Sequence, residues 1–275
     1  MVLSFCVLVI LCSFLLLLLF VMSRQKCSEN SENYSRFNVG DVKVFAIYIP
    51  DRLENIKNAL EGLGLEATYV PGISKEFLHP DKLLQDGIIT PEWVEYSTTN
   101  KYEVDFRKPV NTGRVGCHLG HLAVLTAFLD SSATYALIFE DDIDVPPETM
   151  PEMKIQINQV LSEIPADAQI VYLSYCWEKC AKLIPASNPI FSHAVRPLCR
   201  HAYLVRRDGA SVILETTYPM RDSGDKMVAD LIQQGVLKAY VVNPSFLEIR
   251  QKRHLTGIFK SNSGNTKASQ ACVPP

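Results

Sequence analysis

An apolar run that ends abruptly in carboxylates sets tight limits on how this chain folds. Residues Tyr135–Phe139 are apolar or aromatic, and the acids Glu140, Asp141, Asp142 and Asp144 follow them. Such a run, bounded by acids and prolines, predicts a buried strand whose carboxyl end leaves a sheet, the edge at which open α/β sheets bind ligands. Adjacent carboxylates resist joint ionisation, and a divalent cation with a preference for oxygen, Mg²⁺ or Mn²⁺, removes the conflict. A solvated acidic turn is the alternative for the same residues.

The composition bounds the number of domains and excludes one class of partner. The chain has 275 residues, 47% of them apolar, which suits one large domain once the N-terminal segment is set aside. The net charge is -3 and the pI about 6.1, so the chain has no overall basic field of the kind that attracts nucleic acid. We therefore expect no nucleic-acid partner.

The N-terminus has the composition of a membrane segment. Val2–Met22 is apolar apart from two serines and two cysteines and is long enough to cross a bilayer. Residues 1–23 are therefore predicted to be a signal-anchor or, with cleavage near Ser23, a signal peptide. The basic residues Arg24 and Lys26 follow the run, which by charge alone would favour a cytosolic C-terminal part, so the orientation is inferred below from function.

A polar stretch at residues 24–41 is predicted to be a stalk or linker. It carries one sequon, Asn33-Tyr34-Ser35, which would accept a glycan in a lumenal stalk. An even number of cysteines lies outside the N-terminal segment, which permits disulfides in an oxidising compartment, but the spacing does not give their pairing. These cysteines are Cys27, Cys117, Cys176, Cys180, Cys199 and Cys272.

Strands and helices alternate through the rest of the chain. The expected strands are 42–49, 66–70, 135–139, 168–173, 201–205 and 237–242. The expected helices are 52–63, an apolar stretch at 119–129 that begins at Gly116–His118, and 151–164, 208–215 and 226–234. This order predicts a single α/β domain at 42–259 with a mostly parallel central sheet, and the Ser/Asn/Lys-rich tail at 260–275 is predicted to be disordered.

Four segments, taken together and in this order, resemble glycosyltransferase family 25. They are Ile49–Arg52 after the first strand, Gly113–His121, the strand end Phe139–Asp142, and the segment from His201 to Ala210. The family includes bacterial lipooligosaccharide galactosyltransferases and eukaryotic collagen galactosyltransferases. The resemblance implies a GT-A-like, Rossmann-like fold, a nucleotide-sugar donor, usually UDP-galactose, and a divalent metal, often Mn²⁺, at the acidic motif.

The metal and nucleotide contacts are assigned from this combination. Asp142 is the best metal ligand, Asp144 lies on the same alternation, and His254 matches the late histidine that often completes a GT-A metal site. An exposed basic loop is the alternative for His254. Alternation turns Asp141 towards the ribose or the second side of the ion, and Glu140 towards the neighbouring strand.

Two arginines are predicted to contact the nucleotide. The resemblance implies this for Arg52, although the arginine-rich start of the family is thinned here, and the guanidinium of Arg114 matches phosphate geometry. A surface ion pair is the alternative for Arg114.

Two histidines, one within the expected helix and one just before residue 119, have the spacing of some zinc ligands. His118 and His121 are three residues apart beside Cys117, but no third soft ligand lies nearby in the sequence. Helix-packing histidines are therefore the favoured interpretation. The family context also gives His121 a second possibility, a hydrogen bond to the substrate or to the acidic strand.

A general base for an acceptor hydroxyl is expected among the carboxylates before the helix at 226–234. Asp225 is the first candidate and Asp222 the second, because a carboxylate commonly takes such a proton. An N-cap role is the alternative for Asp225 and is compatible with a catalytic one.

The sequence and its resemblance to the family thus predict an inverting, metal-dependent glycosyltransferase that moves a hexose from a UDP-sugar to a hydroxyl on a glycan or protein. The resemblance implies galactose as the hexose. A membrane-tethered enzyme of the endoplasmic reticulum or Golgi lumen fits this activity, or a secreted one if the N-terminal segment is cleaved. Two rivals use the same features: another metal-dependent nucleotide-using transferase, such as a nucleotidyltransferase, and a catalytically inactive binding protein of the same fold.

Overall fold

The computed structural model describes residues 41–94, 111–179, 182–252 and 271–272. The predicted anchor or signal peptide at 1–23, the stalk at 24–41 apart from its last residue, and His254 lie outside these ranges, as does most of the tail at 260–275. Within the described ranges, no helix combines the length and the apolar character needed to cross a membrane. The described elements all belong to one unit, Gly40–Pro275.

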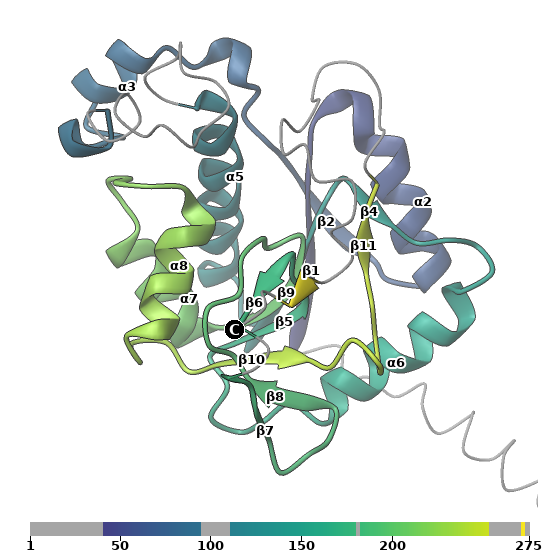
Figure 1. The fold of residues 1–275 in the computed structure, drawn as a ribbon. Helices are drawn as coiled ribbons and strands as arrows, with labels where there is room; N and C mark the ends of the chain where they lie inside the picture. Colours follow the sequence, from purple (N-terminus) through teal and green to yellow (C-terminus); the bar gives the residue numbers. More distant parts are fainter. Residues whose placement is uncertain (1–40, 95–110, 180–181, 253–270, 273–275) are drawn as a thin grey trace, which may run out of the picture. The chain divides into compact units, whose positions relative to one another are not determined.

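An eight-stranded sheet forms the centre of this unit, in the order β2-β1-β3-β9-β5-β10-β8-β7 (Figure 1). The neighbours β2, β1 and β3 are parallel, as are β5 and β10, whereas β9 runs antiparallel between β3 and β5, and β8 runs antiparallel to both β10 and β7. All strands of this sheet except β9 and β8 therefore run in one direction, which confirms the predicted mostly parallel sheet. The bounds are β1 Val42–Tyr48, β2 Ala67–Pro71, β3 Tyr135–Glu140, β5 Ile170–Ser174, β7 Ile184–Pro185, β8 Phe191–His193, β9 Ala202–Arg206 and β10 Ala239–Val242.

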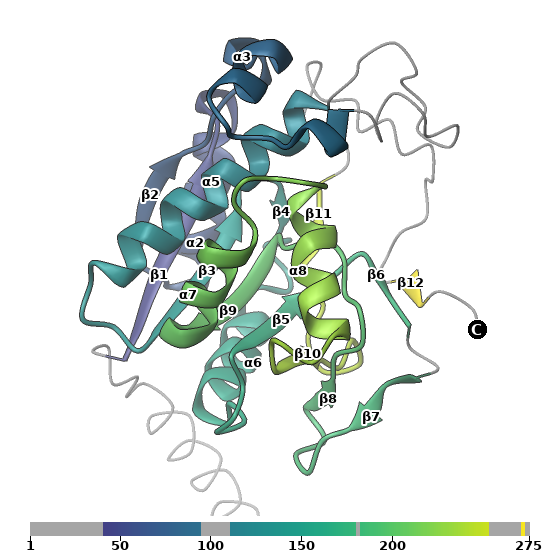
Figure 2. The same ribbon diagram turned by 90° about the vertical axis from the view of Figure 1, so that its left-hand side faces the viewer.

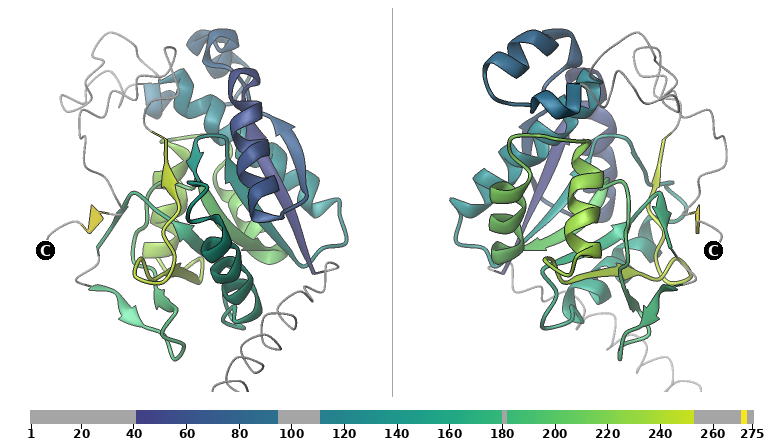
Figure 3. Two further views of the ribbon diagram at one scale, coloured as in Figure 1. Left: turned by 90° about the vertical axis from the view of Figure 1, so that its right-hand side faces the viewer. Right: turned by 60° about the vertical axis from the view of Figure 1, so that its left-hand side comes forward.

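Helices cover both faces of the sheet. On one face α5, α7 and α8 lie side by side (Figure 2), and on the other α2 contacts α6 (Figure 3). Alternate strand residues such as Phe45, Ile138 and Tyr203 are fully buried in one cluster with Leu125 of α5 and Ile213 of α7. The bounds are α2 Leu53–Leu63, α3 Pro80–Gln85, α5 Thr112–Leu129, α6 Met150–Ser162, α7 Arg207–Thr216 and α8 Gly224–Gln233, with short 3₁₀ turns η1 Pro50–Arg52 and η2 Lys75–Phe77.

The β-α-β opening is confirmed, and its helix ends where glycine permits. α2 joins β1 to the parallel strand β2. Its C-cap is Gly64, whose φ of 68° lies in the left-handed region that a residue without Cβ adopts readily.

Helix α5 begins earlier than predicted. It starts at Thr112 because the side chain of Asn111 caps it, accepting hydrogen bonds from the backbone N–H groups of Gly113 and Arg114 at 3.1 and 3.3 Å. The expected start at Gly116–His118 was too late, since the apolar pattern does not extend to this polar first turn. Cys117, His118 and His121 consequently all lie within the helix.

The C-terminal part of the chain returns to the acidic strand end. The short strand β11 (Arg250–Gln251) pairs antiparallel with β4 (Ile143–Asp144), and the N–H of Lys252 donates to the carbonyl of Asp142 at 2.6 Å. A second short pairing joins β12 (Ala271–Cys272) to β6 (Trp177–Glu178). These two-residue strands carry too little pattern to predict from sequence, yet the first brings residues about 110 positions apart side by side.

A disulfide joins Cys176 and Cys199, with 5.5 Å between their Cα atoms. Cys117 is a free and exposed thiol. The disulfide resolves one pairing that spacing left open, and it lies directly before Arg200, a residue that proves central to the site.

Candidate functional site

Asp141 ties the acidic strand end to the end of the first strand. Its Oδ2 accepts a hydrogen bond from the N–H of Ile49 at 2.7 Å, and its Oδ1 accepts one from Nη1 of Arg52 at 3.2 Å. Burial raises the pKa of Asp141, and these two donors act in the opposite direction. Two of the predicted nucleotide-contacting residues, Arg52 and Asp141, thus meet each other here.

The negative charge of Asp142 is only weakly offset by the donors around it. Nε2 of Gln251 lies 3.3 and 3.4 Å from its two oxygens, and Nη1 of Arg52 lies 3.6 Å from Oδ2. Burial, and then the charges of Glu140 and Asp141, raise the pKa of Asp142 to about 7. Its side chain remains 21% exposed, so the unfavourable charge is accessible from solvent. This is the electrostatic situation that a bound cation relieves.

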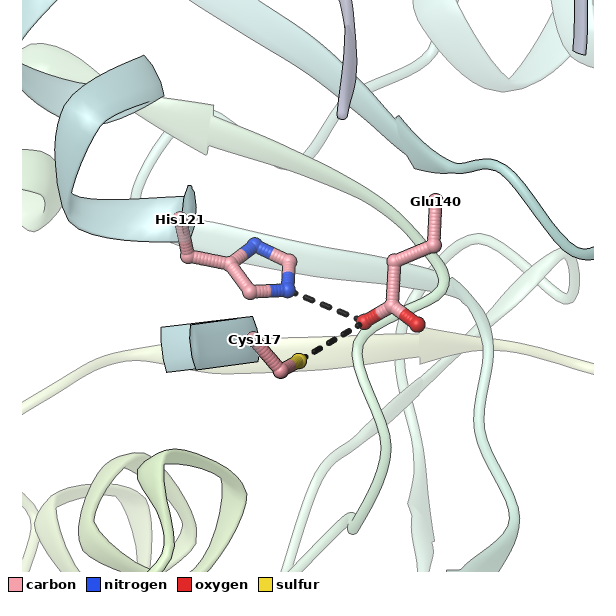
Figure 4. Close-up of side chains that lie close together, drawn as sticks. All are labelled: Cys117, His121 and Glu140. Atoms are coloured by element: carbon pink, nitrogen blue, oxygen red, sulfur yellow. Dashed lines mark hydrogen bonds and ion pairs between the residues drawn. The ribbon is translucent and has the colours of Figure 1, made fainter. Parts of the chain in front are cut away.

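Glu140 faces helix α5 and not the neighbouring strand, so the expectation for its orientation was wrong. Its Oε1 lies 2.9 Å from Nε2 of His121 and 3.8 Å from Sγ of Cys117 (Figure 4). His121 is fully buried, and its Nδ1 lies 3.1 Å from the hydroxyl of Tyr203. Burial raises the pKa of Glu140 to about 7, with the charge of Asp225 as the next cause. The acidic strand end therefore extends to side chains on α5.

His118, one turn away on the same helix, is a packing histidine as predicted. Its Nε2 lies 3.0 Å from Oγ1 of Thr217, and its Nδ1 accepts from Nη2 of Arg200 at 3.1 Å. Burial, followed by the charge of Arg200, lowers the pKa of His118, which keeps the imidazole neutral. His118 thus supports Arg200.

Asp225 is held by a buried arginine. Nε of Arg200, a side chain only 1% exposed, donates to Oδ1 of Asp225 at 3.3 Å, while the Asp225 side chain is 33% exposed. The predicted N-cap role of Asp225 was wrong, since Ser223 occupies the N-cap of α8 and Asp225 lies in the first turn. Because Asp225 raises the pKa of Glu140, it lies within electrostatic range of the acidic strand end.

Asp222 is engaged locally. Its Oδ1 accepts from the N–H of Ser223 at 2.7 Å, and its Oδ2 forms an ion pair with Lys226, one turn along α8. These contacts tie both of its oxygens to the start of the helix. Of the two candidate bases, Asp225 is the one whose charge raises the pKa of Glu140 at the acidic strand end.

The remaining predicted site residues lie further out. Arg114 is exposed in the first turn of α5. Asp144 pairs in register with Arg250, and its Oδ1 lies 4.0 Å from Nζ of Lys252. The structure therefore brings Arg52, Asp141 and Asp142 into direct contact, whereas Asp144 and Arg114 lie at the edge; His254 is outside the described residues.

Sequence reasoning missed Arg200 and Gln251. Arg200 follows a cysteine in a loop, and Gln251 lies on a two-residue strand, so neither has a local pattern that marks it. Their contacts with Asp225 and Asp142 span 25 and 109 positions. That Arg200 is buried is visible only once the fold is known.

Gly224 is required where α8 approaches α5. A Cβ at this position would lie 2.3 Å from Nδ1 of His118 and 2.7 Å from Nη2 of Arg200, closer than such atoms can approach. Gly224→Ala should therefore lower the free energy of unfolding by about 1–3 kcal/mol, as overpacking does in a rigid core. Urea denaturation measures this. Gly113→Ala is the control, since its Cβ would meet only the Asn111 side chain, at 3.2 Å. Equal stability of the Gly224 variant and the parent protein would show that the two helices separate easily.

The sequence matches the model of a known protein family. The sequence matches the model described as "Glycosyltransferase family 25 (LPS biosynthesis protein)" over residues 49–232, which is 184 of 275 residues. A solved structure described as a glycosyltransferase involved in the glycosylation of the major capsid of PBCV-1 is similar with a TM-score of 0.42 and 9% identity, over 74% of this chain and 82% of that chain. No curated protein sequence matches.

Proposed function

Since the chain belongs to glycosyltransferase family 25, we propose that it transfers a hexose, galactose in the first instance, from a UDP-sugar to a hydroxyl of a glycan or protein. Family membership makes the chain a glycosyltransferase, with a nucleotide sugar as donor and a glycan as acceptor. The proposal adds the sugar, the nucleotide, the metal and the residues. It also adds inversion at the anomeric carbon, by a single displacement.

The observation that carries this proposal is the crowding of carboxylates at the end of β3. Glu140 and Asp142 both have pKa values raised to about 7, so both are only partly ionised at neutral pH without added positive charge. The oxygen donors suit Mn²⁺ or Mg²⁺, which are commonly bound by one or two carboxylates together with substrate phosphates. The residues present therefore fit a divalent cation at Asp142.

We assign Asp142 as the principal ligand and Asp144 and His254 as further ligands. His254 follows Lys252 by two residues, and the N–H of Lys252 is bonded to the carbonyl of Asp142. A bound cation would act as a Lewis acid that neutralises the departing diphosphate. Arg114 is the candidate for a phosphate contact. Arg52, after β1, and Asp141, after β3, would border the nucleotide.

Asp225 is proposed as the general base. Its carboxylate would take the proton of the acceptor hydroxyl as that oxygen attacks the anomeric carbon and the bond to the diphosphate breaks. Arg200 holds the Asp225 carboxylate in place from the protein interior. Arg200 is buried, and its guanidinium is itself hydrogen-bonded to His118. The remaining exposure of Asp225 leaves it open to an acceptor.

The pKa values predict how pH governs the cation. Below pH 7 Glu140 and Asp142 hold protons that a cation must displace, and above pH 7 they are ionised. Mn²⁺ should therefore bind about tenfold more weakly at pH 6 than at pH 8, for one displaced proton. Calorimetric titration with Mn²⁺ at both values measures this, with Asp142→Asn as the control that loses both the affinity and its pH dependence. Equal affinities at the two values would contradict the assignment.

A lumenal location is part of the proposal. The disulfide between Cys176 and Cys199 is of the kind that persists in oxidising compartments such as the endoplasmic reticulum and Golgi. We propose that residues 1–23 anchor the enzyme in such a membrane, or direct secretion if cleaved. A glycan on Asn33, detected as a mobility shift that is lost in Asn33→Gln, would place the stalk in the lumen. An unmodified Asn33 in cells that glycosylate a control protein would count against a lumenal stalk.

A panel of UDP-sugars with Mn²⁺ and simple glycan acceptors tests the function. The expected result is release of UDP and a glycosylated product with UDP-galactose, and less with UDP-glucose. Release of pyrophosphate from a nucleoside triphosphate would instead indicate a nucleotidyltransferase. Donor binding without turnover for any acceptor would favour a binding protein of the same fold.

A further inference from the structure

We infer that Cys117, His121 and Glu140 form a binding site for a thiophilic divalent cation such as Zn²⁺, separate from the oxygen-donor site at Asp142. One ligand atom from each residue, Sγ, a ring nitrogen and a carboxylate oxygen, lies within 4.8 Å of the other two. Figure 4 shows the thiol and the imidazole both directed at the carboxylate. Zinc was disfavoured from the sequence because no third ligand lies near these residues along the chain. In the fold, Glu140 at the end of β3 supplies that ligand.

The spacing of these atoms is close to that of a tetrahedral zinc site. With Zn–S of about 2.3 Å and Zn–N and Zn–O of about 2.1 Å, the sulfur-to-oxygen and nitrogen-to-oxygen separations are about 3.6 and 3.4 Å. The observed separations are 3.8 Å from Sγ of Cys117 to Oε1 of Glu140, and 2.9 Å from Nε2 of His121 to the same oxygen. Side-chain shifts of a few tenths of an ångström would admit the ion.

The imidazole is held in the orientation that a metal ligand needs. His121 is fully buried, and its Nδ1 is bonded to the hydroxyl of Tyr203, itself fully buried. A partner on one ring nitrogen fixes the ring and directs the other nitrogen at the ion, as in most zinc-bound histidines. Cys117 lies one helical turn before His121, so α5 presents both ligands on the same side.

The chemistry of the ligands separates this site from the one at Asp142. Cys117 is a free, solvent-exposed thiol, whereas Cys176 and Cys199 are consumed in their disulfide. Thiolate and imidazole select Zn²⁺ over Mn²⁺ and Mg²⁺, which prefer carboxylates and phosphates. Three protein ligands also leave a fourth tetrahedral position for water.

Cobalt tests the inference, because Co²⁺ occupies zinc sites and a thiolate ligand gives it a charge-transfer absorption in the near ultraviolet. We expect the full-length protein, with its disulfide intact and no UDP-sugar present, to develop this absorption with Co²⁺ and to lose it when Zn²⁺ is added. Cys117→Ser should abolish the absorption, and Glu140→Gln should weaken Co²⁺ binding at least tenfold. Asp142→Asn is the matched control and should keep the absorption.

The outcomes are separable from those for the transferase. No absorption in the parent protein, or an absorption that survives Cys117→Ser, would overturn the inference, since the thiolate would be absent or come from another cysteine. Circular dichroism is the check that each variant is folded, and the exposure of Cys117 makes its replacement mild. An inactive transferase that still binds Co²⁺ would leave the inference standing.

Discussion

Asp142→Asn should reduce kcat/KM for glycosyl transfer by about 10³-fold or more, on the scale of losing a principal electrostatic contact to the leaving group. The carboxylate is replaced by an amide of the same shape that cannot carry the charge a divalent cation needs. Folding should be unimpaired at pH 8, because the variant removes a charge that Glu140 and Asp141 disfavour. Steady-state kinetics with UDP-galactose and Mn²⁺, beside thermal unfolding, measure both effects.

Asp144→Asn is the matched control for this variant. Its side chain is 37% exposed and lies 4.0 Å from Nζ of Lys252, so its loss should reduce activity by about tenfold or less. An Asp142 variant with near-normal kcat/KM would contradict the assignment. An Asp142 variant that fails to fold would instead give the carboxylate a structural role.

Asp225→Asn should lower kcat by about 10²–10⁴-fold, the range for losing a general base. The donor KM should change little, because the residue acts on the acceptor hydroxyl and not on the nucleotide. The amide can still accept from Nε of Arg200, so the position of the side chain is kept while its basicity is lost. Initial rates over a range of donor and acceptor concentrations separate the two effects.

Asp222→Asn tests whether any nearby carboxylate would serve. Asp222 is bonded to the N–H of Ser223 and paired with Lys226, so its variant should lose some stability of α8 but keep most of its kcat. If the two variants lose activity equally, neither is the specific base. If Asp222→Asn loses more, the roles assigned to them are reversed.

The sequence predicted the parts of the fold that are encoded locally. The apolar residues Ala136–Phe139 are buried in β3 because they leave no polar face. Glu140 is the last residue of the strand, and Asp141 and Asp142 follow it outside the sheet. The mostly parallel order followed from the alternation of strands and helices. Helix α5 was placed too late because its first turn is set by the capping side chain of Asn111 and not by an apolar pattern.

The candidate site was only half predictable, since its contacts join distant segments. His118 and His121 are three residues apart on one helix, yet one faces Arg200 and the other Glu140. No local pattern distinguishes them. The N-cap alternative for Asp225 was wrong because α8 begins at Gly224, with Ser223 at the N-cap. The contact that does hold the Asp225 carboxylate comes from a buried arginine 25 positions earlier and requires the assembled core.

Donor binding tests the central claim most directly, namely that the acidic end of β3 holds a cation which in turn holds the nucleotide sugar. Calorimetric titration of the full-length protein with UDP-galactose should give binding with Mn²⁺, none with EDTA, and none for Asp142→Asn in either condition. Equal binding with Mn²⁺ and with EDTA, or binding by Asp142→Asn as tight as by the parent protein, would contradict it.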